Sequence, residues 1–271
     1  MVNAKSRELK SGGDMTGDAL RFEPDVHRAL WGYEEWLVCA HHTSPGRIVG
    51  GGGKTLCDVC PSFPLLVKKI CAEKRLSVQV HPNDETAKTV GGEAKTEMWC
   101  VLKAGPIFAG LKPGATAADV MRATADGTFE ELLVRYDAKP GECYFIPGGL
   151  VHAIGEGTSV YEVQQSSNTT FRLYDWGRVG ADGRPRPLHV REGLAAMDLA
   201  LPPPTPSDAV KCPYFEFVQL RGDGASPSHL GPTDEWRVVY TPSTDDSCLL
   251  PPGGELTLPA PSFVTAVRRK R

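Results

Sequence analysis

The sequence lacks long apolar runs and a strong charge of either sign. None of its apolar stretches approaches the ~20 residues of a membrane-spanning helix, and its N-terminal segment has no apolar core typical of a signal peptide. Its 30 basic and 33 acidic residues leave a net charge of −3, without the basic surplus typical of nucleic-acid-binding proteins. We therefore expect a cytoplasmic protein whose partners are neither nucleic acids nor membranes.

Helical patterns are scarce, whereas turn-forming residues are abundant. The chain has 29 Gly and 23 Pro among 271 residues, and such frequent turns between short alternating segments are typical of antiparallel β barrels. The one helical pattern spans about 116–136, where Thr116 precedes "AADVMRAT", and Thr128 and Glu131 have the spacing of a capping box. The sequence predicts a mostly-β fold, a jelly-roll barrel with a short helical insertion.

Composition divides the chain into four segments. We expect a flexible N-terminal tail at 1–21, because apolar alternation begins only near Phe22. The barrel would occupy 22–199, and the proline-rich stretch at 200–208 reads as a linker. Further strand patterns at 209–271 predict a second, smaller β unit.

The eight cysteines are scattered along the chain, and several lie in apolar runs, as Cys100 does in "MWCVL". This distribution favours buried free thiols in a reducing cytosol over a disulfide framework. Cys57 and Cys60, in "CDVC", have the spacing of metal ligands, but a thiolate site needs a second such pair and the sequence has none. We do not expect these two residues to bind metal.

The segment "LSVQVHP" alternates apolar with polar residues, which predicts a strand with Ser77, Gln79 and His81 on one face. Together with Glu97 in "KTEMW" and His152 in "IPGGLVHAI", this face offers two imidazoles, a carboxylate and an amide. Such a set suits Zn²⁺. A single histidine on a strand is more often a hydrogen-bonded structural residue, so the residues alone leave both interpretations open.

A family resemblance favours the metal site. "FPLLVKKI", "LSVQVHPNDETA", "KTEMWCVL", "IPGGLVHAI" and "VQQSSNTTFRLYDWGR" resemble the type I mannose-6-phosphate isomerases, most of all the short bacterial form, within the cupin superfamily. The resemblance implies a cupin jelly roll with one zinc ion held by Gln79, His81, Glu97 and His152. The second β unit then reads as a truncated cupin-like unit.

The resemblance also implies catalytic and substrate-binding roles. It implies that Arg172 is catalytic, and that Lys95 and Ser77 lie near the sugar substrate or its phosphate. Aldose–ketose isomerisation moves a proton through an enediolate, and fixed positive charge from Arg172 and Lys95 would stabilise it. Each residue also has a simpler interpretation: Arg172 in an ion pair with Asp175 or Glu162, Lys95 as a solvated turn residue, Ser77 as a strand hydrogen-bond partner.

Two departures from the family leave a second function open. The segment 50–63 is short where the family has a helical segment, and residues 209–271 are compact. Our first hypothesis is a zinc-dependent isomerase interconverting mannose 6-phosphate and fructose 6-phosphate. The alternative is a catalytically weak cupin that binds zinc and a sugar phosphate as a sensor. An iron oxygenase is less favoured, because a facial triad leaves more coordination positions open. The sequence indicates neither the general base nor the oligomeric state.

Overall fold

The computed structural model describes residues 19–180, 182–221, 228–259 and 261–268. The predicted tail lies outside the described residues up to 18, but Leu20 forms a β-bridge with Leu249. The last residues of that expected tail are therefore part of the fold. None of the helices in the described ranges is long and apolar enough to cross a bilayer.

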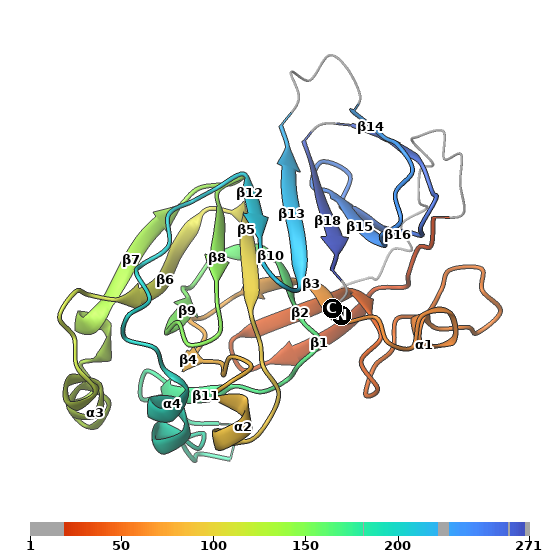
Figure 1. The fold of residues 1–271 in the computed structure, drawn as a ribbon. Helices are drawn as coiled ribbons and strands as arrows, with labels where there is room; N and C mark the ends of the chain where they lie inside the picture. The colour runs from red at the N-terminus through yellow and green to blue at the C-terminus, as the bar shows by residue number, and fades with distance from the viewer. Residues whose placement is uncertain (1–18, 181, 222–227, 260, 269–271) are drawn as a thin grey trace.

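Two antiparallel sheets face each other and build the predicted mostly-β barrel (Figure 1). The first sheet has six strands in the order β1 (Asp25–Ala29), β2 (Gly32–Cys39), β3 (Leu65–Ala72), β10 (Ser159–Gln165), β5 (Glu97–Lys103) and β8 (Cys143–Ile146). The second has five strands in the order β11 (Phe171–Tyr174), β4 (Val78–Val80), β9 (His152–Ile154), β6 (Gly105–Leu111) and β7 (Leu133–Ala138). This arrangement agrees with a cupin-type fold.

Each strand of the first sheet sends alternate side chains to opposite faces, and the two faces have different partners. Ile70 and Trp99 belong to a core shared with Ile107 of the second sheet, so they point into the barrel. Met98 and Tyr161 belong to a core on the other face, which faces the C-terminal strands. Polar residues in phase with Ile70 and Trp99 must therefore lie inside the barrel.

Helices cover the outer face of the second sheet, where Val78, Val80 and Phe108 pack against them. They are α2 (Ala87–Val90), α3 (Ala117–Asp126), the 3₁₀ helix η1 (Phe129–Leu132) and α4 (Val190–Ala196). A further one-turn helix, α1 (Leu56–Val59), lies apart from this sheet (Figure 1).

The predicted helical insertion at 116–136 is partly wrong. Thr116 caps α3, since its hydroxyl accepts a hydrogen bond from the backbone amide of Asp119. Thr128, by contrast, makes no side-chain cap. The helical part ends at Leu132, because the alternating residues from Leu133 onward pair as β7 with β6.

Residues beyond 208 form a third sheet, with strands in the order β12 (Ala209–Lys211), β13 (Phe215–Leu220), β18 (Ser262–Val267), β15 (Arg237–Thr241) and β16 (Asp246–Leu250), and a small ladder of β14 (Ser228–Leu230) with β17 (Leu256–Leu258). The third sheet packs on the first, where the rings of Tyr161 and Tyr240 stack 4.8 Å apart. The proline-rich segment before it lies against the barrel: the Tyr136 hydroxyl donates to the Pro204 carbonyl.

The expectation that all cysteines are free thiols is wrong for one pair. Cys100 on β5 and Cys143 on β8 are direct cross-strand partners with Cα atoms 4.1 Å apart, and they form a disulfide. Sequence spacing could not indicate this, because the pairing depends on the register of two strands that are distant in the chain. The other six cysteines form no disulfide among the described residues.

Candidate metal centre and cavity

Four strands of the barrel bring the candidate metal ligands together. Gln79 on β4 is the Cα partner of His152 on β9 and of Arg172 on β11. Glu97 is the first residue of β5 in the opposite sheet, and His81 follows β4 directly. The polar face predicted for "LSVQVHP" therefore points into the barrel, not into solvent.

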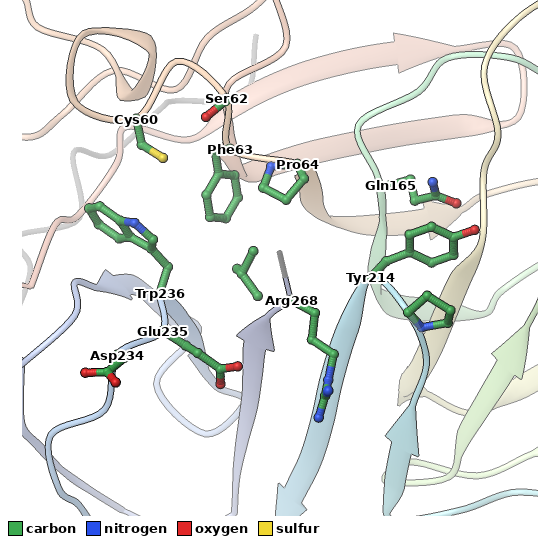
Figure 2. A pocket seen from close by; sticks show the side chains of 12 residues that line it. Cys60, Ser62, Phe63, Pro64, Gln165, Tyr214, Asp234, Glu235, Trp236 and Arg268 are labelled. Atoms are coloured by element: carbon green, nitrogen blue, oxygen red, sulfur yellow. The ribbon is translucent and has the colours of Figure 1, made fainter. Parts of the chain in front are cut away.

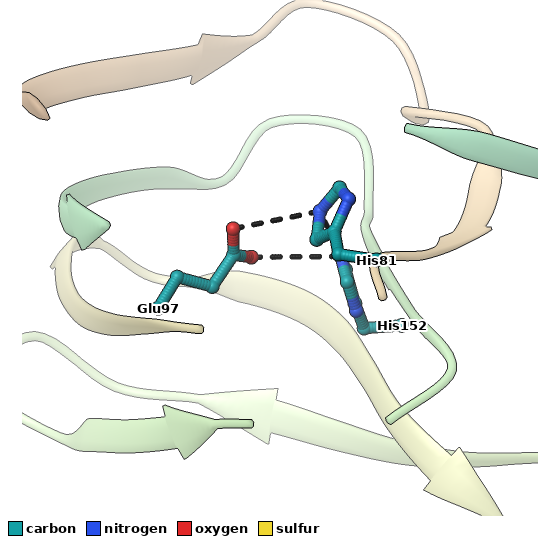
Figure 3. Close-up of side chains that lie close together, drawn as sticks. All are labelled: His81, Glu97 and His152. Atoms are coloured by element: carbon teal, nitrogen blue, oxygen red, sulfur yellow. Dashed lines mark hydrogen bonds and ion pairs between the residues drawn. The ribbon is translucent and has the colours of Figure 1, made fainter. Parts of the chain in front are cut away.

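His81, Glu97 and His152 form a compact buried cluster (Figure 3). The two Nε2 atoms lie 3.2 Å apart, and each lies 3.5 Å from an oxygen of Glu97. All three side chains are about 1% exposed or less. Two imidazoles and a carboxylate converging within metal-ligand reach match the ligands of a zinc or similar divalent site.

Backbone carbonyls fix the orientation of both imidazoles. Nδ1 of His81 lies 2.8 Å from the Thr169 carbonyl, and Nδ1 of His152 lies 2.8 Å from the Leu150 carbonyl. Because a carbonyl only accepts, Nδ1 carries the proton in each ring and the Nε2 lone pairs face each other. Metal-binding histidines are typically held in this way.

Burial keeps both imidazoles uncharged. Desolvation, followed by the positive charge of Lys95, lowers the pKa of His152 to about 4 and lowers the pKa of His81 well below its usual value. Metal binding requires neutral imidazole. In addition, Glu97 Oε1 is buried and has no hydrogen-bond partner. The cluster therefore fits a divalent cation, because its imidazole nitrogens are unprotonated at Nε2 and a carboxylate oxygen of Glu97 has no other partner.

Gln79, the expected fourth ligand, lies beside this cluster. Its Nε2 is 3.4 Å from His152 Nε2, and its Oε1 accepts a hydrogen bond of 3.3 Å from Ser77 Oγ. Rotation of the amide by half a turn would present the oxygen to the cluster instead. Ser77 therefore bonds the Gln79 side chain within its own segment, and not a neighbouring strand as the simpler interpretation had it.

Lys95 is a buried residue of the cluster's surroundings, not a solvated turn lysine. Its Nζ lies 2.9 Å from His81 Nε2 and 2.5 Å from Glu97 Oε2, and the residue is 5% exposed. Glu162 is 4.0 Å away. Burial raises the pKa of Glu162, and the charge of Glu97 raises it further, while Lys68 and Lys95 oppose this effect. The barrel interior around the cluster therefore contains a network of buried charged residues.

Arg172 makes neither of the ion pairs considered from the sequence. Its Nη1 donates to the Pro187 carbonyl at 2.8 Å, and its Nε is buried without a partner. Asp175 pairs instead with Arg178 and Arg186. The guanidinium is thus held by the backbone, close to Gln79, with hydrogen-bonding capacity to spare.

These groups share one cavity of about 410 Å³. Ser77, Gln79, Lys95, His152 and Arg172 line it together. The sequence indicated no role for several other lining residues, namely Glu34, Lys68, Trp99 and Arg186, and it suggested Glu162 only as an ion-pair partner of Arg172. Strand alternation could have identified the residues on strands, because it places their side chains in the barrel interior. Arg186 lies in a loop, where no periodicity indicates the direction of its side chain.

A larger cavity of about 1270 Å³ lies between the first sheet and the C-terminal strands (Figure 2). Phe63, Tyr214, Trp236 and Cys60 are among its lining residues. The candidate metal-binding group found among the described residues, His81, Glu97 and His152, does not line this cavity, and it includes neither cysteine of "CDVC". Size therefore does not identify the candidate site, whereas the buried ligand cluster does.

Comparison with known proteins agrees with this geometry. No family model matches the chain. The mannose-6-phosphate isomerase ManA of Bacillus subtilis (strain 168) is 34% identical over 220 residues, which cover 68% of this chain and 70% of the relative. The mannose-6-phosphate isomerase of Streptococcus mutans is 38% identical over 144 residues, or 52% of this chain and 45% of that relative.

Solved structures show the same fold. The crystal structure of the Bacillus subtilis mannose 6-phosphate isomerase matches with a TM-score of 0.69 at 24% identity, covering 92% of this chain and 97% of the other. A zinc-bound mannose 6-phosphate isomerase matches with a TM-score of 0.57 at 14% identity, covering 93% and 99%. From the identity and coverage shared with ManA, the chain belongs to the mannose-6-phosphate isomerase family.

Proposed function

We propose that this protein interconverts mannose 6-phosphate and fructose 6-phosphate and that it uses one zinc ion. The observation that carries the proposal is the buried His81–Glu97–His152 cluster, which lies at the cavity that Lys95 and Arg172 also reach. Family membership supplies the substrate pair, since the relatives are named mannose-6-phosphate isomerases. The alternative of a catalytically weak sensor is not favoured by these relatives.

His81, Glu97 and His152, with Gln79 as a fourth ligand, would hold the ion. When bound, zinc supplies Lewis-acid polarisation of the sugar oxygens. The Nδ1 contacts to the Thr169 and Leu150 carbonyls keep both imidazoles in the orientation that exposes Nε2 to the ion.

The cationic residues act on the charge that develops during proton transfer between C1 and C2. An enediolate is an oxyanion, and preorganised positive groups in a dry site stabilise it strongly. Arg172 retains its charge across the physiological range, and Lys95 is buried beside the ligands. We propose catalytic roles for both and propose that Ser77, Lys95 and Arg172 contact the substrate.

We also propose that residues 22–199 form the catalytic unit, that 200–208 link it to a smaller unit at 209–271, and that the protein works in the cytoplasm. Every residue proposed for the site lies in the first of these segments. Six of the eight cysteines lie outside the disulfide, which suits a reducing compartment.

A coupled assay tests the proposal directly. Zinc-loaded protein should convert mannose 6-phosphate to fructose 6-phosphate, and protein stripped by a chelator should not until zinc is restored. Bound zinc without turnover would contradict the isomerase assignment and leave a metal-binding protein. Turnover that survives complete chelation would contradict the role of the metal.

A further inference from the structure

An arginine cluster lines one side of the cavity, where the chain leaves β11. Arg172 and Arg186 line the cavity, and Arg178 lies beside them. The carboxylate that this cluster contacts is Asp175, which lies 2.5 Å from Arg178 and 2.6 Å from Arg186. Two of the three guanidinium groups pair with this one carboxylate, and Arg172 pairs with a backbone carbonyl instead. The three arginines and Asp175 together carry a surplus of about two positive charges, similar to the charge of a phosphate monoester dianion.

Asp175 holds Arg186 by one edge of its guanidinium. Nε and Nη2 of Arg186 donate to the two carboxylate oxygens at 2.7 and 2.6 Å. Nη1 has no hydrogen-bond partner among the described residues, and the side chain is 21% exposed. Burial acts to raise the pKa of Asp175, but hydrogen bonds from Arg186 and Arg178 lower it overall, so the carboxylate stays ionised.

The cavity has a reactive end and an arginine end. Gln79 touches His152 in the metal cluster and is the strand partner of Arg172. Arg172 Nη1 donates to the carbonyl of Pro187, the residue after Arg186, and both arginines line the cavity. Burial, and then the positive charge of Arg186, lowers the pKa of Arg172. Arg186 itself makes no hydrogen bond or ion pair with the metal cluster. A chain of contacts therefore leads from His152 through Gln79 and Arg172 to the segment that carries Arg186.

We propose that Arg186, oriented by Asp175, binds the phosphate of the substrate and selects phosphorylated over unphosphorylated sugars. The second edge of the Arg186 guanidinium, formed by Nη1 and Nη2, has the fork geometry with which arginine binds phosphate oxygens. Arg172 then remains next to the metal cluster, where the sugar carbons react. This inference rests on the proposed isomerase function for the identity of the sugar, although the phosphate site can be tested without turnover.

Arg186→Ala should raise the KM for mannose 6-phosphate by about 10- to 100-fold, the loss expected for hydrogen bonds to a charged group. The kcat should change far less, and turnover of unphosphorylated mannose should not change. Arg186→Lys keeps the charge but lacks the fork, so its KM should be intermediate. Arg135→Ala is the matched control, because Arg135 also pairs with one aspartate, Asp137, but lies outside the lining of the cavity.

Calorimetric titration with inorganic phosphate separates this inference from the proposed function. Wild type and Arg135→Ala should bind phosphate, and Arg186→Ala should bind it at least tenfold more weakly, even in a preparation without turnover. Folded Arg186→Ala with unchanged phosphate affinity and unchanged KM would overturn the inference. If the alanine variant fails to fold, the lysine variant provides the test. An Arg186→Lys protein that binds phosphate as tightly as the wild type would overturn the proposal that the guanidinium fork binds the phosphate.

Discussion

The Nε2 atoms of His81 and His152 lie 3.2 Å apart, and neither carries a proton, because each ring donates from Nδ1 to a carbonyl. Two lone pairs facing each other in a buried site are unfavourable unless a donor or a cation lies between them. Lys95 supplies one such partner, at 2.9 Å from His81. Buried polar groups left in this arrangement are typical of a functional site, and here they favour a metal ion.

Removal of one imidazole should remove the metal and the activity together. His152→Ala deletes one of the proposed ligands, so metal content after dialysis, measured by elemental analysis, should fall from one ion per chain to near zero, with turnover lost in parallel. His229→Ala removes an exposed imidazole of the C-terminal unit and should retain both properties. A folded His152→Ala protein with full zinc content would contradict the ligand assignment.

Arg172→Ala should separate metal binding from catalysis. The side chain lies beside Gln79 without contacting the three-residue cluster, so zinc content should stay at one ion per chain. Turnover should fall by about 10²- to 10³-fold if Arg172 stabilises the enediolate, as for the loss of one main oxyanion donor. The measurement is the kcat of the zinc-loaded variant compared with that of the zinc-loaded wild type. Equal values would rule out a catalytic role for Arg172.

The metal-free protein should lose stability as the pH falls from 6.5 toward 4. Burial lowers the pKa of His152 to about 4 in the folded state, whereas an unfolded chain has a histidine pKa near ~6.5. Below pH 6.5 the unfolded state takes up the proton first, so the contribution, roughly 3 kcal/mol, is present above that pH and is lost toward the folded pKa.

Urea midpoints of chelator-treated protein at several pH values measure this loss. His152→Gln is the control, because it cannot titrate, and its stability should vary less between pH 6.5 and 4. Identical pH dependence in the two proteins would show that His152 is not the group responsible.

The disulfide between Cys100 and Cys143 predicts a definite thiol count. Protein unfolded without reductant should show six reactive thiols, and reduction should raise the number to eight. The variant Cys143→Ala should show seven thiols without reductant, since the freed Cys100 then reacts. Eight thiols in unreduced wild type would contradict the disulfide and support the free-thiol expectation from the sequence.

Several features followed from local sequence because they depend on local rules. The alternation in "LSVQVHP" predicted the strand and the shared face of Gln79 and His81, because side chains two apart on a strand point the same way. Thr116 followed from capping preferences. The strand at Leu133 was missed, because its pairing with β6 outweighed a helical pattern that local propensity favoured.

Contacts between residues that are far apart in the chain could not be predicted from the sequence. Lys95 looked like a turn residue, and only folding placed it between His81 and Glu97. Arg186 lies in a loop without periodicity, so nothing local indicated that Asp175 would direct it to the cavity. Glu162 gained its buried setting from Lys68 on one neighbouring strand and Trp99 on the other.

The sequence by itself determined the residue types of the site and the strands that carry them, because the β period of two and the ligand chemistry of His, Glu and Gln are local properties. Only the tertiary structure decided that these strands face the barrel interior and that His81, Glu97 and His152 converge within metal-ligand reach. It also decided which cations accompany them, because register and sheet packing set distances between residues far apart in the chain.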